Sequence, residues 1–327
     1  MSLRNSDEAL KLINQSREIA ILSPDSPDSD SVSSNLALIY TLTALGKKVF
    51  WLSAEKLPPM FDWMVKDRPY LLPPDFGQIK GLDLVIITDA GSLKQFDKLT
   101  TGNSWLLDAK TLIIDHHATR DDFEPTVGII EPEAAATGEL LYDLYQKVGW
   151  EIAPEIADLM MEGILADTNS FQNLNVDKKV LEVSSKLVAK GANIYNLQQA
   201  HIQATAFNEP AFKTLATLMQ ETVFDGEIVY GLIPYKSVAD FGDDFEFTVT
   251  LGERIRYLKG VKVSFVLAEK EDGSLRLSIR SQPGIDVSRV AASFGGGGHK
   301  VAAGAKISGK DLSEAAKLVV AEIKKQL

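Results

Sequence analysis

Two of the four histidines lie side by side in Asp115-His116-His117, directly after the apolar run 111–114. Four further aspartates lie near the ends of other predicted elements: Asp28, Asp30, Asp89 and Asp167. With no cysteine in the chain, the available donors are carboxylates and imidazoles, which suit Mn²⁺, Mg²⁺ or another hard divalent ion. Two such ions about 3.5–4 Å apart can activate water and clamp the attacking and leaving oxygens of a phosphoryl displacement. The pattern therefore indicates a metal-dependent phosphoester site.

Each aspartate also has an ordinary structural explanation. Asp28 and Asp30 lie in a loop rich in Ser, Pro and Asp before a helix, so either one alone can be an N-cap or an Asx-turn residue. Asp89 can be a turn residue, and Asp167 can cap a helix end. The adjacent histidines are harder to explain in this way. Because all of these residues except Asp167 follow predicted strands, their joint placement favours a site.

The elements that must position these residues alternate between strands and helices. Apolar runs predict strands at 18–22, 48–52, 82–88 and 111–114. Amphipathic stretches predict helices at 7–17, 33–45, 137–148 and 155–165. This alternation predicts an α/β domain with a mostly parallel sheet covered by helices on both faces. In such sheets ligands gather beyond the carboxyl ends of the strands, where the motif residues are expected to meet.

The pattern changes after about residue 178. Helical stretches continue to about 221, and two hairpins follow, with turns at Asp225-Gly226 and Asp272-Gly273. Near the C-terminus we expect a helix at 287–294, a strand at 303–307 and a last helix from Leu312. Asp311 is the expected N-cap of that last helix. We therefore expect a parallel α/β domain, a helical linker and a smaller α+β domain. Their predicted ranges are 1–185, 186–215 and 216–327.

Composition limits the class of protein and its partners. The 327 residues, 45% apolar and 24% charged, are typical of a globular chain with room for two domains. No apolar run reaches the roughly 18 residues of a membrane span, and the N-terminal residues lack the apolar core of a signal peptide. With no cysteine for disulfides, this predicts a cytoplasmic protein with no membrane partner. The net charge of −11 favours a short anionic ligand over a long duplex, which usually needs a basic face.

Five segments together resemble the ordered motifs of the DHH phosphoesterase superfamily: 27–34, Asp89, Asp115-His116-His117, 136–139 and 167–171. That superfamily includes the RecJ exonucleases, the manganese-dependent family II pyrophosphatases and the nanoRNase/pAp-phosphatase group. The resemblance implies the metal ligands Asp28, Asp30, Asp89, His116 and Asp167. It also implies that His117 binds the scissile phosphate or donates a proton to the leaving oxygen. Asp115 is then expected to orient a histidine, an arrangement common behind metal-bound imidazoles.

The first motif departs from the family pattern. That motif usually reads His-x-Asn-Pro-Asp-x-Asp, whereas Pro24 stands at the histidine position and Ser26 at the asparagine position. A proline side chain cannot ligate a metal. One ion is therefore expected to bind more weakly, to gain a water ligand or to recruit Asp25, with reduced activity. The alternative is a nucleotide-binding protein whose catalysis is impaired.

A second constellation lies near the C-terminus. Alone, the glycine run 295–298 is often a flexible linker, and Arg280 alone is often a solvated strand residue. Here the run follows a predicted helix and leads into His299 and a small-residue stretch, and Arg280 can fork onto a phosphate. Together these segments resemble the DHHA1 domain of the nanoRNase/pAp-phosphatase group. The resemblance implies a domain that binds the nucleotide end of the substrate, with contacts from Arg280, Ser281, Gly296, Gly297, Gly298 and His299.

The sequence thus predicts a phosphodiesterase or phosphatase with two divalent ions, Mn²⁺ first and Mg²⁺ also compatible. Its expected substrates are short oligoribonucleotides, linear dinucleotides such as pApA, or 3′-phosphoadenosine 5′-phosphate, all yielding nucleoside monophosphates. A long-strand exonuclease is disfavoured by the charge. The oligomeric state stays open, with a homodimer among the options. Arg120 is a further, weaker candidate for phosphate contact.

Overall fold

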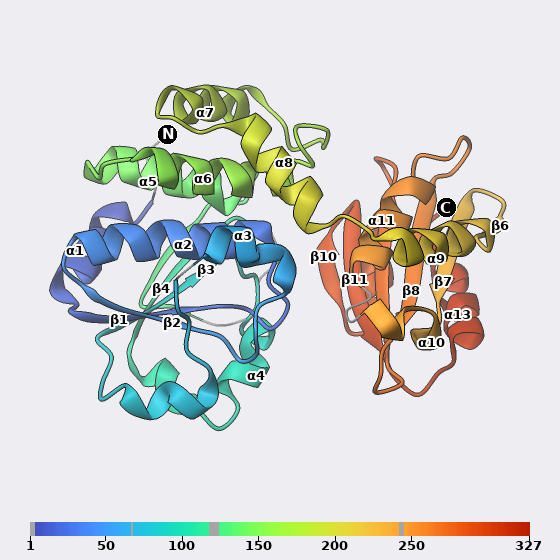
Figure 1. The fold of residues 1–327 in the computed structure, drawn as a ribbon, viewed down its shortest axis with the longest axis horizontal. Helices are drawn as coiled ribbons and strands as arrows, with labels where there is room; N and C mark the ends of the chain where they lie inside the picture. Colours follow the sequence, from blue (N-terminus) through green and yellow to red (C-terminus); the bar gives the residue numbers. More distant parts are fainter. Residues whose placement is uncertain (1–3, 67, 118–123, 242–244) are drawn as a thin grey trace. The chain divides into compact units, whose positions relative to one another are not determined.

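The computed structural model describes residues 4–66, 68–117, 124–241 and 245–327. The chain divides into two compact units, Met1–Ala204 and Thr205–Leu327 (Figure 1). This division falls within the stretch 186–215 that the sequence indicates as a linker, and the finer three-part division stays a prediction. Among the described residues, no helix is long and apolar enough to cross a membrane.

The first unit alternates strands and helices. In chain order its elements are α1 (Ser6–Gln15), β1 (Glu18–Leu22), α2 (Ser29–Ala44), β2 (Lys48–Leu52), α3 (Asp62–Val65), β3 (Leu84–Thr88), α4 (Asp97–Thr100), β4 (Lys110–Asp115), β5 (Val127–Ile130), α5 (Thr137–Val148), α6 (Pro154–Asp167), α7 (Lys178–Ala189) and α8 (Ile194–Ala204). Short 3-10 helices lie at Pro59–Phe61, Pro73–Gln78, Leu93–Phe96 and Ser104–Asp108.

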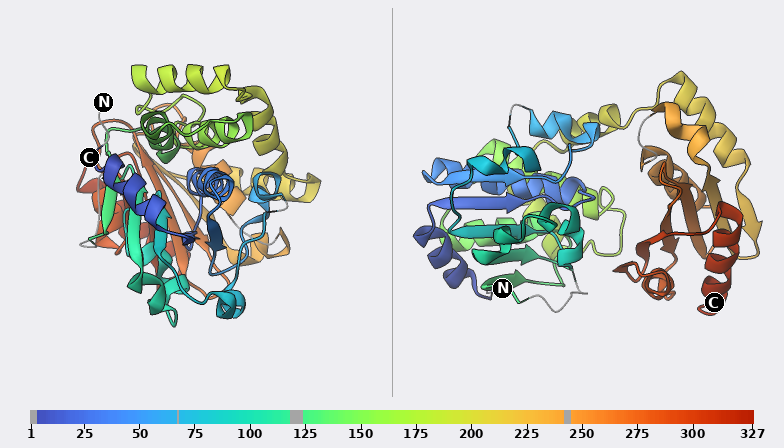
Figure 2. Two further views of the ribbon diagram at one scale, coloured as in Figure 1. Left: turned by 90° about the vertical axis from the view of Figure 1, so that its left-hand side faces the viewer. Right: turned by 90° about the horizontal axis from the view of Figure 1, so that it is seen from below.

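The strands of this unit form a parallel sheet in the order β2-β1-β3-β4-β5. Its strands are apolar because both faces are covered, as expected for a parallel sheet. Figures 1 and 2 show α2, α5 and α6 together on one face, with α7 outside them. The other face is covered by α4 and 3-10 segments, whose Phe76, Phe96, Leu99 and Leu106 are buried against it. The predicted parallel α/β fold is confirmed, although full-length helices cover only one face.

Two details of the first unit differ from the sequence prediction. Helix α2 begins at Ser29 and not near Ser33, because Asp28 caps it through a reciprocal pair of bonds with Ser31. Asp30 therefore lies in the first turn of a helix, not in the preceding loop. Strand β5, which the sequence analysis did not predict, adds an edge to the sheet beside β4.

The second unit is a sheet with helices. Its elements are α9 (Glu209–Gln220), β6 (Val223–Asp225), β7 (Ile228–Ile233), α10 (Tyr235–Val238), a 3-10 turn at Ala239–Phe241, α11 (Phe245–Ile255), β8 (Val263–Glu269), β9 (Leu275–Ser281), α12 (Val287–Ser293), β10 (Gly297–His299), β11 (Ala302–Ile307) and α13 (Leu312–Lys324). Asp311 caps α13 as predicted, its side chain accepting from Glu314 N at 2.8 Å.

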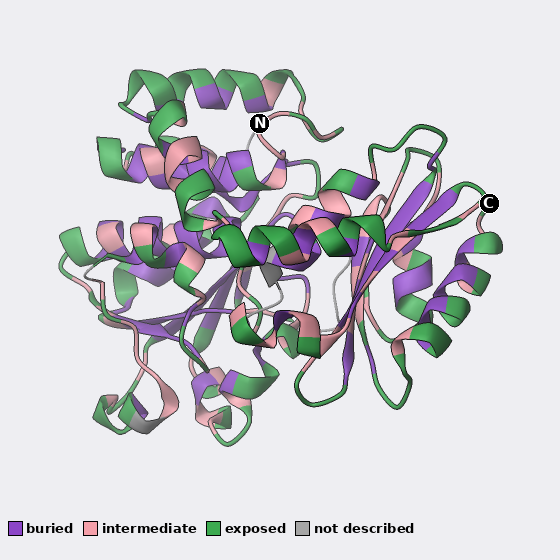
Figure 3. Ribbon diagram, turned by 45° about the vertical axis from the view of Figure 1, so that its right-hand side comes forward, coloured by how far each residue is buried: buried purple, intermediate pink, exposed green. Residues whose placement is uncertain are grey.

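The second sheet has the order β10-β11-β9-β8-β7-β6. Both predicted hairpins are present, but β7 and β8 pair in parallel, so the sheet is mixed and not purely antiparallel. One face packs on α12 and α13 and the other on α9 and α11. In Figure 3 the central strands are largely buried, whereas the outer surface of α9 is exposed.

The contact between α5 and α6 leaves no room for a side chain at Gly138. A Cβ placed there would lie 2.4 Å from Met160 O, a backbone atom that cannot move without displacing α6. We predict that Gly138→Ala lowers the free energy of unfolding of the first unit by about 1–3 kcal/mol. All four tryptophans lie in residues 51–150, so tryptophan fluorescence in a urea titration reports on this unit alone.

Gly81→Ala is the matched control, because a Cβ at Gly81 would meet nothing within 4 Å. Its effect should stay within about 0.5 kcal/mol, as for most exposed positions. Equal urea midpoints for the two variants would contradict the close packing of α5 on α6.

Candidate functional site

Four predicted ligands meet beyond the carboxyl ends of the first sheet. In the part of the chain that the structure describes, Asp30, Asp89, His116 and Asp167 form a group whose donor atoms all lie within 4.8 Å of one another. They come from the first turn of α2, the ends of β3 and β4, and the last residue of α6. Residues separated by up to about 140 positions are thus brought to one edge of the sheet, as ligand sites of open α/β sheets require.

His116 is oriented by a backbone carbonyl. Its Nδ1 lies 3.2 Å from Ala134 O, and because a carbonyl only accepts, this nitrogen carries a proton. Its Nε2 points to Asp167 Oδ2 at 3.0 Å and Asp89 Oδ1 at 3.3 Å. A carbonyl behind one ring nitrogen is the usual way in which proteins aim the other at a metal. The ring is therefore held with Nε2 among the carboxylates.

The carboxylate of Asp30 lies at the N-terminus of α5. Its Oδ2 accepts a hydrogen bond from Thr137 N at 2.6 Å, and its Oδ1 accepts one from Gly138 N at 3.0 Å. Unpaired amides and the dipole at a helix N-terminus favour negative charge. Thr137 also donates from Oγ1 to Asp89 Oδ1 at 3.1 Å. Thr137 belongs to the motif segment 136–139, but the sequence assigned it no individual role, and its contacts with Asp30 and Asp89 emerge only in the structure.

Two local backbone features bring the carboxylates close together. Asp89 has φ 54°, a left-handed conformation that costs roughly 1–2 kcal/mol for a residue other than glycine and that concentrates at functional sites. Gly163 of α6 gives Asp30 its space, because a Cβ there would lie 2.1 Å from Asp30 Oδ1. Helix α6 can therefore approach the site only with glycine at this position.

The electrostatics of the group fit a divalent cation. Burial and the charge of Asp89 raise the pKa of Asp30 to about 8. Burial, together with neighbouring carboxylates, also raises the pKa of Asp89 and of Asp167 to about 7. Burial disfavours the charged form of His116, but its bonds to Asp167 and Asp89 outweigh this and raise its pKa to about 12. Three crowded carboxylates with an imidazole are donors that suit Mn²⁺ or Mg²⁺, so the residues present fit the implied metal.

The first motif contributes less directly than the sequence predicted. Asp28 is not a member of the four-residue group: its Oδ1 accepts from Ser31 N at 2.9 Å and caps α2. Its charge nevertheless helps to raise the pKa of Asp30 and of Asp89, so it lies near the group. Asp25 is held elsewhere, accepting from Lys98 N at 3.0 Å. Its Oδ1 is buried and has no hydrogen-bond partner among the described residues, so the recruitment of Asp25 in place of the missing histidine stays a prediction.

His117 lies beside the group and is held by Asp115. Asp115 Oδ1 accepts from the backbone N of His117 at 3.2 Å and contacts its Nδ1 at 2.7 Å. Burial opposes the charged imidazole, but Asp115 and the charge of Asp89 raise the pKa of His117. Asp115 is fully buried, whereas the side chain of His117 is 24% exposed. Asp115 thus orients His117, whereas the imidazole of His116 is oriented by Ala134 O.

In the second unit, the sheet register places Arg280 and His299 on one face. Arg280 of β9 pairs with Ala302 of β11, which pairs with His299 of β10. Register partners point to the same face, so the two side chains flank small Ala302 at a separation of roughly 10 Å, or two strand spacings. Ser281 points to the opposite face, and its Oγ donates to Ile285 O at 2.8 Å.

Two of the four glycines in the run 295–298 are required by close packing. A Cβ at Gly296 would lie 2.1 Å from Gly304 O, and Gly298 has φ 135° with Ala302 O at 2.7 Å from a Cβ. A Cβ at Gly295 or at Gly297 would meet nothing within 4 Å, and Gly297 lies on the same face as His299 because the two positions are two residues apart. Arg120 lies outside the described residues.

Comparison with known proteins agrees with these features. The DHH family, N-terminal domain, matches residues 18–164, and the DHHA1 domain matches residues 249–325. A Thermus thermophilus protein named bifunctional oligoribonuclease and PAP phosphatase NrnA is 32% identical over 92% of this chain and 87% of its own length. The Bacillus subtilis cyclic-di-AMP phosphodiesterase GdpP is 24% identical over 94% of this chain, which spans 48% of that longer protein.

A crystal structure of an exopolyphosphatase-related protein from Bacteroides fragilis shares the fold, with a TM-score of 0.85 and 23% identity over 99% of this chain and 96% of that one. The chain belongs to the DHH family and carries a DHHA1 domain, which places it among hydrolases that act on ester bonds. The resemblance found in the motifs is thus confirmed.

The raised pKa values predict how pH affects the metal-free protein. Asp30, Asp89 and Asp167 bind protons more tightly in the folded chain than in the unfolded chain, where the ordinary value is 3.8. Stability therefore falls as pH rises from about 4 to about 8, because the folded state holds more protons than the unfolded state. The raised pKa of His116 also lowers stability as the pH rises above 6.5, the ordinary pKa of a histidine.

Because a divalent ion replaces these protons, the rise in thermal midpoint on adding Mn²⁺ should be larger at about pH 8 than at about pH 5. Tryptophan fluorescence during heating, with EDTA or with Mn²⁺, measures both effects. Asp167→Asn should flatten the pH dependence seen in EDTA. An equal Mn²⁺ effect at both pH values would contradict competition between metal and protons.

Proposed function

We propose that this chain is a metal-dependent phosphoesterase that hydrolyses short oligoribonucleotides, linear dinucleotides such as pApA, or 3′-phosphoadenosine 5′-phosphate to nucleoside monophosphates. The observation that carries the proposal is the group Asp30, Asp89, His116 and Asp167, with His117 held beside it by Asp115. The name of the Thermus thermophilus relative, oligoribonuclease and PAP phosphatase, supports this substrate class. We place the activity in the cytoplasm, in keeping with the absence of cysteine.

In this proposal two divalent ions are bound, Mn²⁺ or Mg²⁺, by Asp30, Asp89, His116 and Asp167 with a contribution from Asp28. When bound, such ions supply positive charge that activates water and stabilises a reacting phosphoryl group. His117 has Nδ1 directed at Asp115, so Nε2 is the ring atom that donates to a phosphate oxygen or to the leaving oxygen. The raised pKa of His117 keeps a proton available for either role.

The preference for short substrates follows from charge. With a net charge of −11, the chain repels a long polyanion except where cations are concentrated. On the second unit, β9 places Arg276 and Arg280 on the face that also carries Lys306 of β11 and His299 of β10. This local basic face suits the nucleotide end of a short substrate.

Purified protein with Mn²⁺ should release AMP from pApA and from 3′-phosphoadenosine 5′-phosphate, as measured by chromatography. Asp89→Asn should lower kcat by at least roughly 100-fold, since the variant removes charge at the centre of the group. Asp7→Asn is the matched control, because the Asp7 side chain is 88% exposed. Turnover that survives Asp89→Asn, or that is unaffected by EDTA, would refute the metal-dependent mechanism.

A nucleotide-binding protein with impaired catalysis is the second candidate, favoured by Pro24 and by the use of Asp28 as a helix cap. Binding of AMP without release of product from any of these substrates would support it. Pro24→His then separates the two candidates: restored turnover indicates a hydrolase weakened at one metal position, and continued inactivity with retained AMP binding indicates the binding protein.

The contact between Asp115 and His117 makes a further prediction. Asp115→Asn keeps the size of the side chain but removes the charge that orients and protonates the imidazole. We expect kcat to fall by about 10–100-fold, as for other residues that orient an active-site histidine. The alkaline limb of the pH–rate profile should also move to lower pH, because the pKa of His117 falls. An unchanged profile would assign His117 no role in proton transfer.

A further inference from the structure

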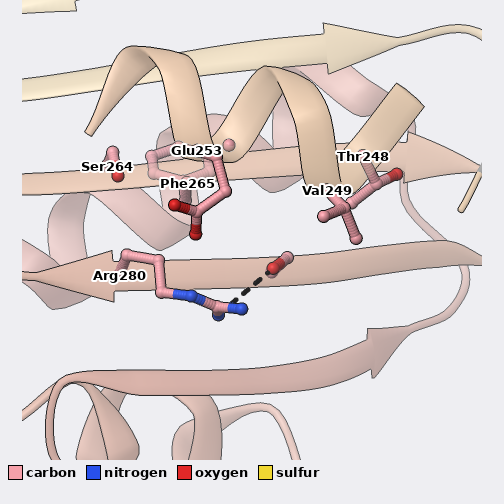
Figure 4. Close-up of a pocket in the computed structure, with 8 residues that line it drawn as sticks. Thr248, Val249, Glu253, Ser264, Phe265 and Arg280 are labelled. Atoms are coloured by element: carbon pink, nitrogen blue, oxygen red, sulfur yellow. Dashed lines mark hydrogen bonds between the residues drawn. The ribbon is translucent and has the colours of Figure 1, made fainter. Parts of the chain in front are cut away.

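The segment that follows Asp167 contains a polar network that no motif indicated. The small cavity of the second unit, lined in part by Arg280, belongs to the predicted nucleotide face (Figure 4), whereas this network adjoins the four-residue group. Its central residue is Asn175, whose Nδ2 donates to Ala135 O at 3.1 Å and to Asp167 O at 3.2 Å. One side chain thus bridges two backbone segments, and each segment sets the place of one member of the group.

Ala135 lies beside the carbonyl that orients His116. The peptide group between Ala134 and Ala135 is planar, and it makes a contact at each end. Ala134 O accepts from His116 Nδ1 at 3.2 Å. At the other end of the plane, Ala135 N donates to Glu139 Oε2 at 2.9 Å. Glu139 is 1% exposed and pairs with Lys179 Nζ at 2.7 Å, so the peptide that aims the imidazole is held by a carboxylate that is itself fixed by a lysine.

Asp167 is the last residue of α6, where backbone carbonyls have no partner within the helix. Its carbonyl oxygen accepts from two side-chain amides, Asn173 Nδ2 at 3.0 Å and Asn175 Nδ2 at 3.2 Å. These contacts fix the backbone from which the Asp167 carboxylate projects. Its Oδ2 lies 3.0 Å from His116 Nε2, so the two ends of the Asn175 bridge lead to side chains that contact each other.

The backbone directly after α6 is strained. Asn169, Ser170 and Phe171 have φ values of 47°, 54° and 65°, a left-handed region that residues other than glycine enter mostly one at a time. Such strain persists only where the surroundings determine the conformation, and it concentrates at functional sites. Thr168 contributes to this, because its Oγ accepts from Phe171 N at 3.1 Å. The strained turn returns Asn175 to the end of α6.

The bridge is not part of the hydrophobic core. Asn175 is an exposed residue, so water molecules can satisfy both carbonyls once the amide is removed. What the amide adds is a fixed link between the two segments. We therefore expect loss of the amide to change the geometry of the group and to leave the fold intact.

We propose that Asn175 is a positioning residue of the four-residue group. Its bridge between the two carbonyls fixes the separation of the His116 imidazole and the Asp167 carboxylate. The inference rests on the proposed function in one respect, that the group binds a divalent ion. It adds a residue outside the motifs to those that determine metal affinity, because metal binding depends on the residues that orient the ligands.

Calorimetric titration of Mn²⁺ into the metal-free full chain tests the proposal. Asn175→Ala should bind Mn²⁺ about tenfold more weakly than the wild type, the lower end of the range for residues that orient metal ligands. Its urea midpoint in EDTA, followed by tryptophan fluorescence, should change no more than for an ordinary surface substitution. Unchanged Mn²⁺ affinity would overturn the proposal, and a urea midpoint that falls together with the affinity would assign Asn175 a structural role instead. If Asn175→Ala does not fold, Asn175→Leu replaces it, because leucine keeps the size of the side chain without the two donors.

Two other asparagines provide matched controls. Asn173→Ala removes the second amide from Asp167 O but leaves the bridge in place. Asn103 donates to a backbone carbonyl near the end of α4, from Nδ2 to Leu99 O at 3.0 Å, on the other face of the sheet. Asn173→Ala and Asn103→Ala should keep Mn²⁺ affinity within about twofold, as for ordinary surface substitutions. An equal loss in Asn173→Ala and Asn175→Ala would attribute the effect to the end of α6 alone and refute the bridge.

The orientation of His116 gives a readout that needs no metal. In EDTA, the Nδ1–H proton of His116 is held by Ala134 O, and nuclear magnetic resonance of protein labelled with ¹⁵N-histidine can follow it. His116→Gln assigns the signal, since the chain has four histidines. Asn175→Ala should speed the exchange of this proton with water by at least about threefold, because local opening of the orienting segment becomes easier. Asn173→Ala should not, and equal exchange rates in the wild type and Asn175→Ala would overturn the proposal.

These measurements involve no substrate, so they separate this inference from the proposed function. A wild type that binds Mn²⁺ but hydrolyses no nucleotide would refute the proposed hydrolase, and the effect of Asn175→Ala on affinity would still decide the inference. Hydrolysis of pApA, with equal Mn²⁺ affinity in the wild type and Asn175→Ala, would retain the phosphoesterase and refute the positioning role.

Discussion

The first unit is organised around electrostatic repulsion that it does not relieve on its own. Buried Asp30 and Asp89 and half-buried Asp167 place carboxylate oxygens within 4.8 Å of one another, where like charges are costly. The fold offsets part of this cost with the N-terminus of α5, the hydroxyl of Thr137 and the imidazole of His116. The repulsion that is not offset raises the pKa values of the three carboxylates. A bound cation would offset this remaining repulsion, and Gly163 and the left-handed backbone of Asp89 bring the carboxylates into positions that could hold one.

Much of this could be predicted from the sequence because local patterns specify parallel strands well. Continuous apolar runs marked β1 to β4, and the acidic and histidine residues that followed them indicated which edge carries the chemistry. The start of α2 was harder, since a serine-rich segment has low helix propensity and the capping pair of Asp28 and Ser31 decides where the helix begins. Strand β5 has only four residues and alternates between buried and half-buried positions, so its apolar signal was too short to recognise.

In the second unit, sequence patterns predict the strands but not how the strands pair. Motifs identified Arg280 and the glycine run, but the roles of their neighbours depend on register: Arg280 and Ser264 are neighbours only because β8 and β9 pair as they do. The parallel pairing of β7 with β8 also has no local signature, since alternation predicts a strand but not its partner.

The spacing of the four grouped side chains along the chain has a consequence for biosynthesis. They are numbered 30, 89, 116 and 167, and the last ends α6. During translation the parallel strands are therefore complete long before Asp167 leaves the ribosome. Until Asp167 is synthesised only three of the four donors exist, so the complete group can form only after all five strands of the sheet have been made.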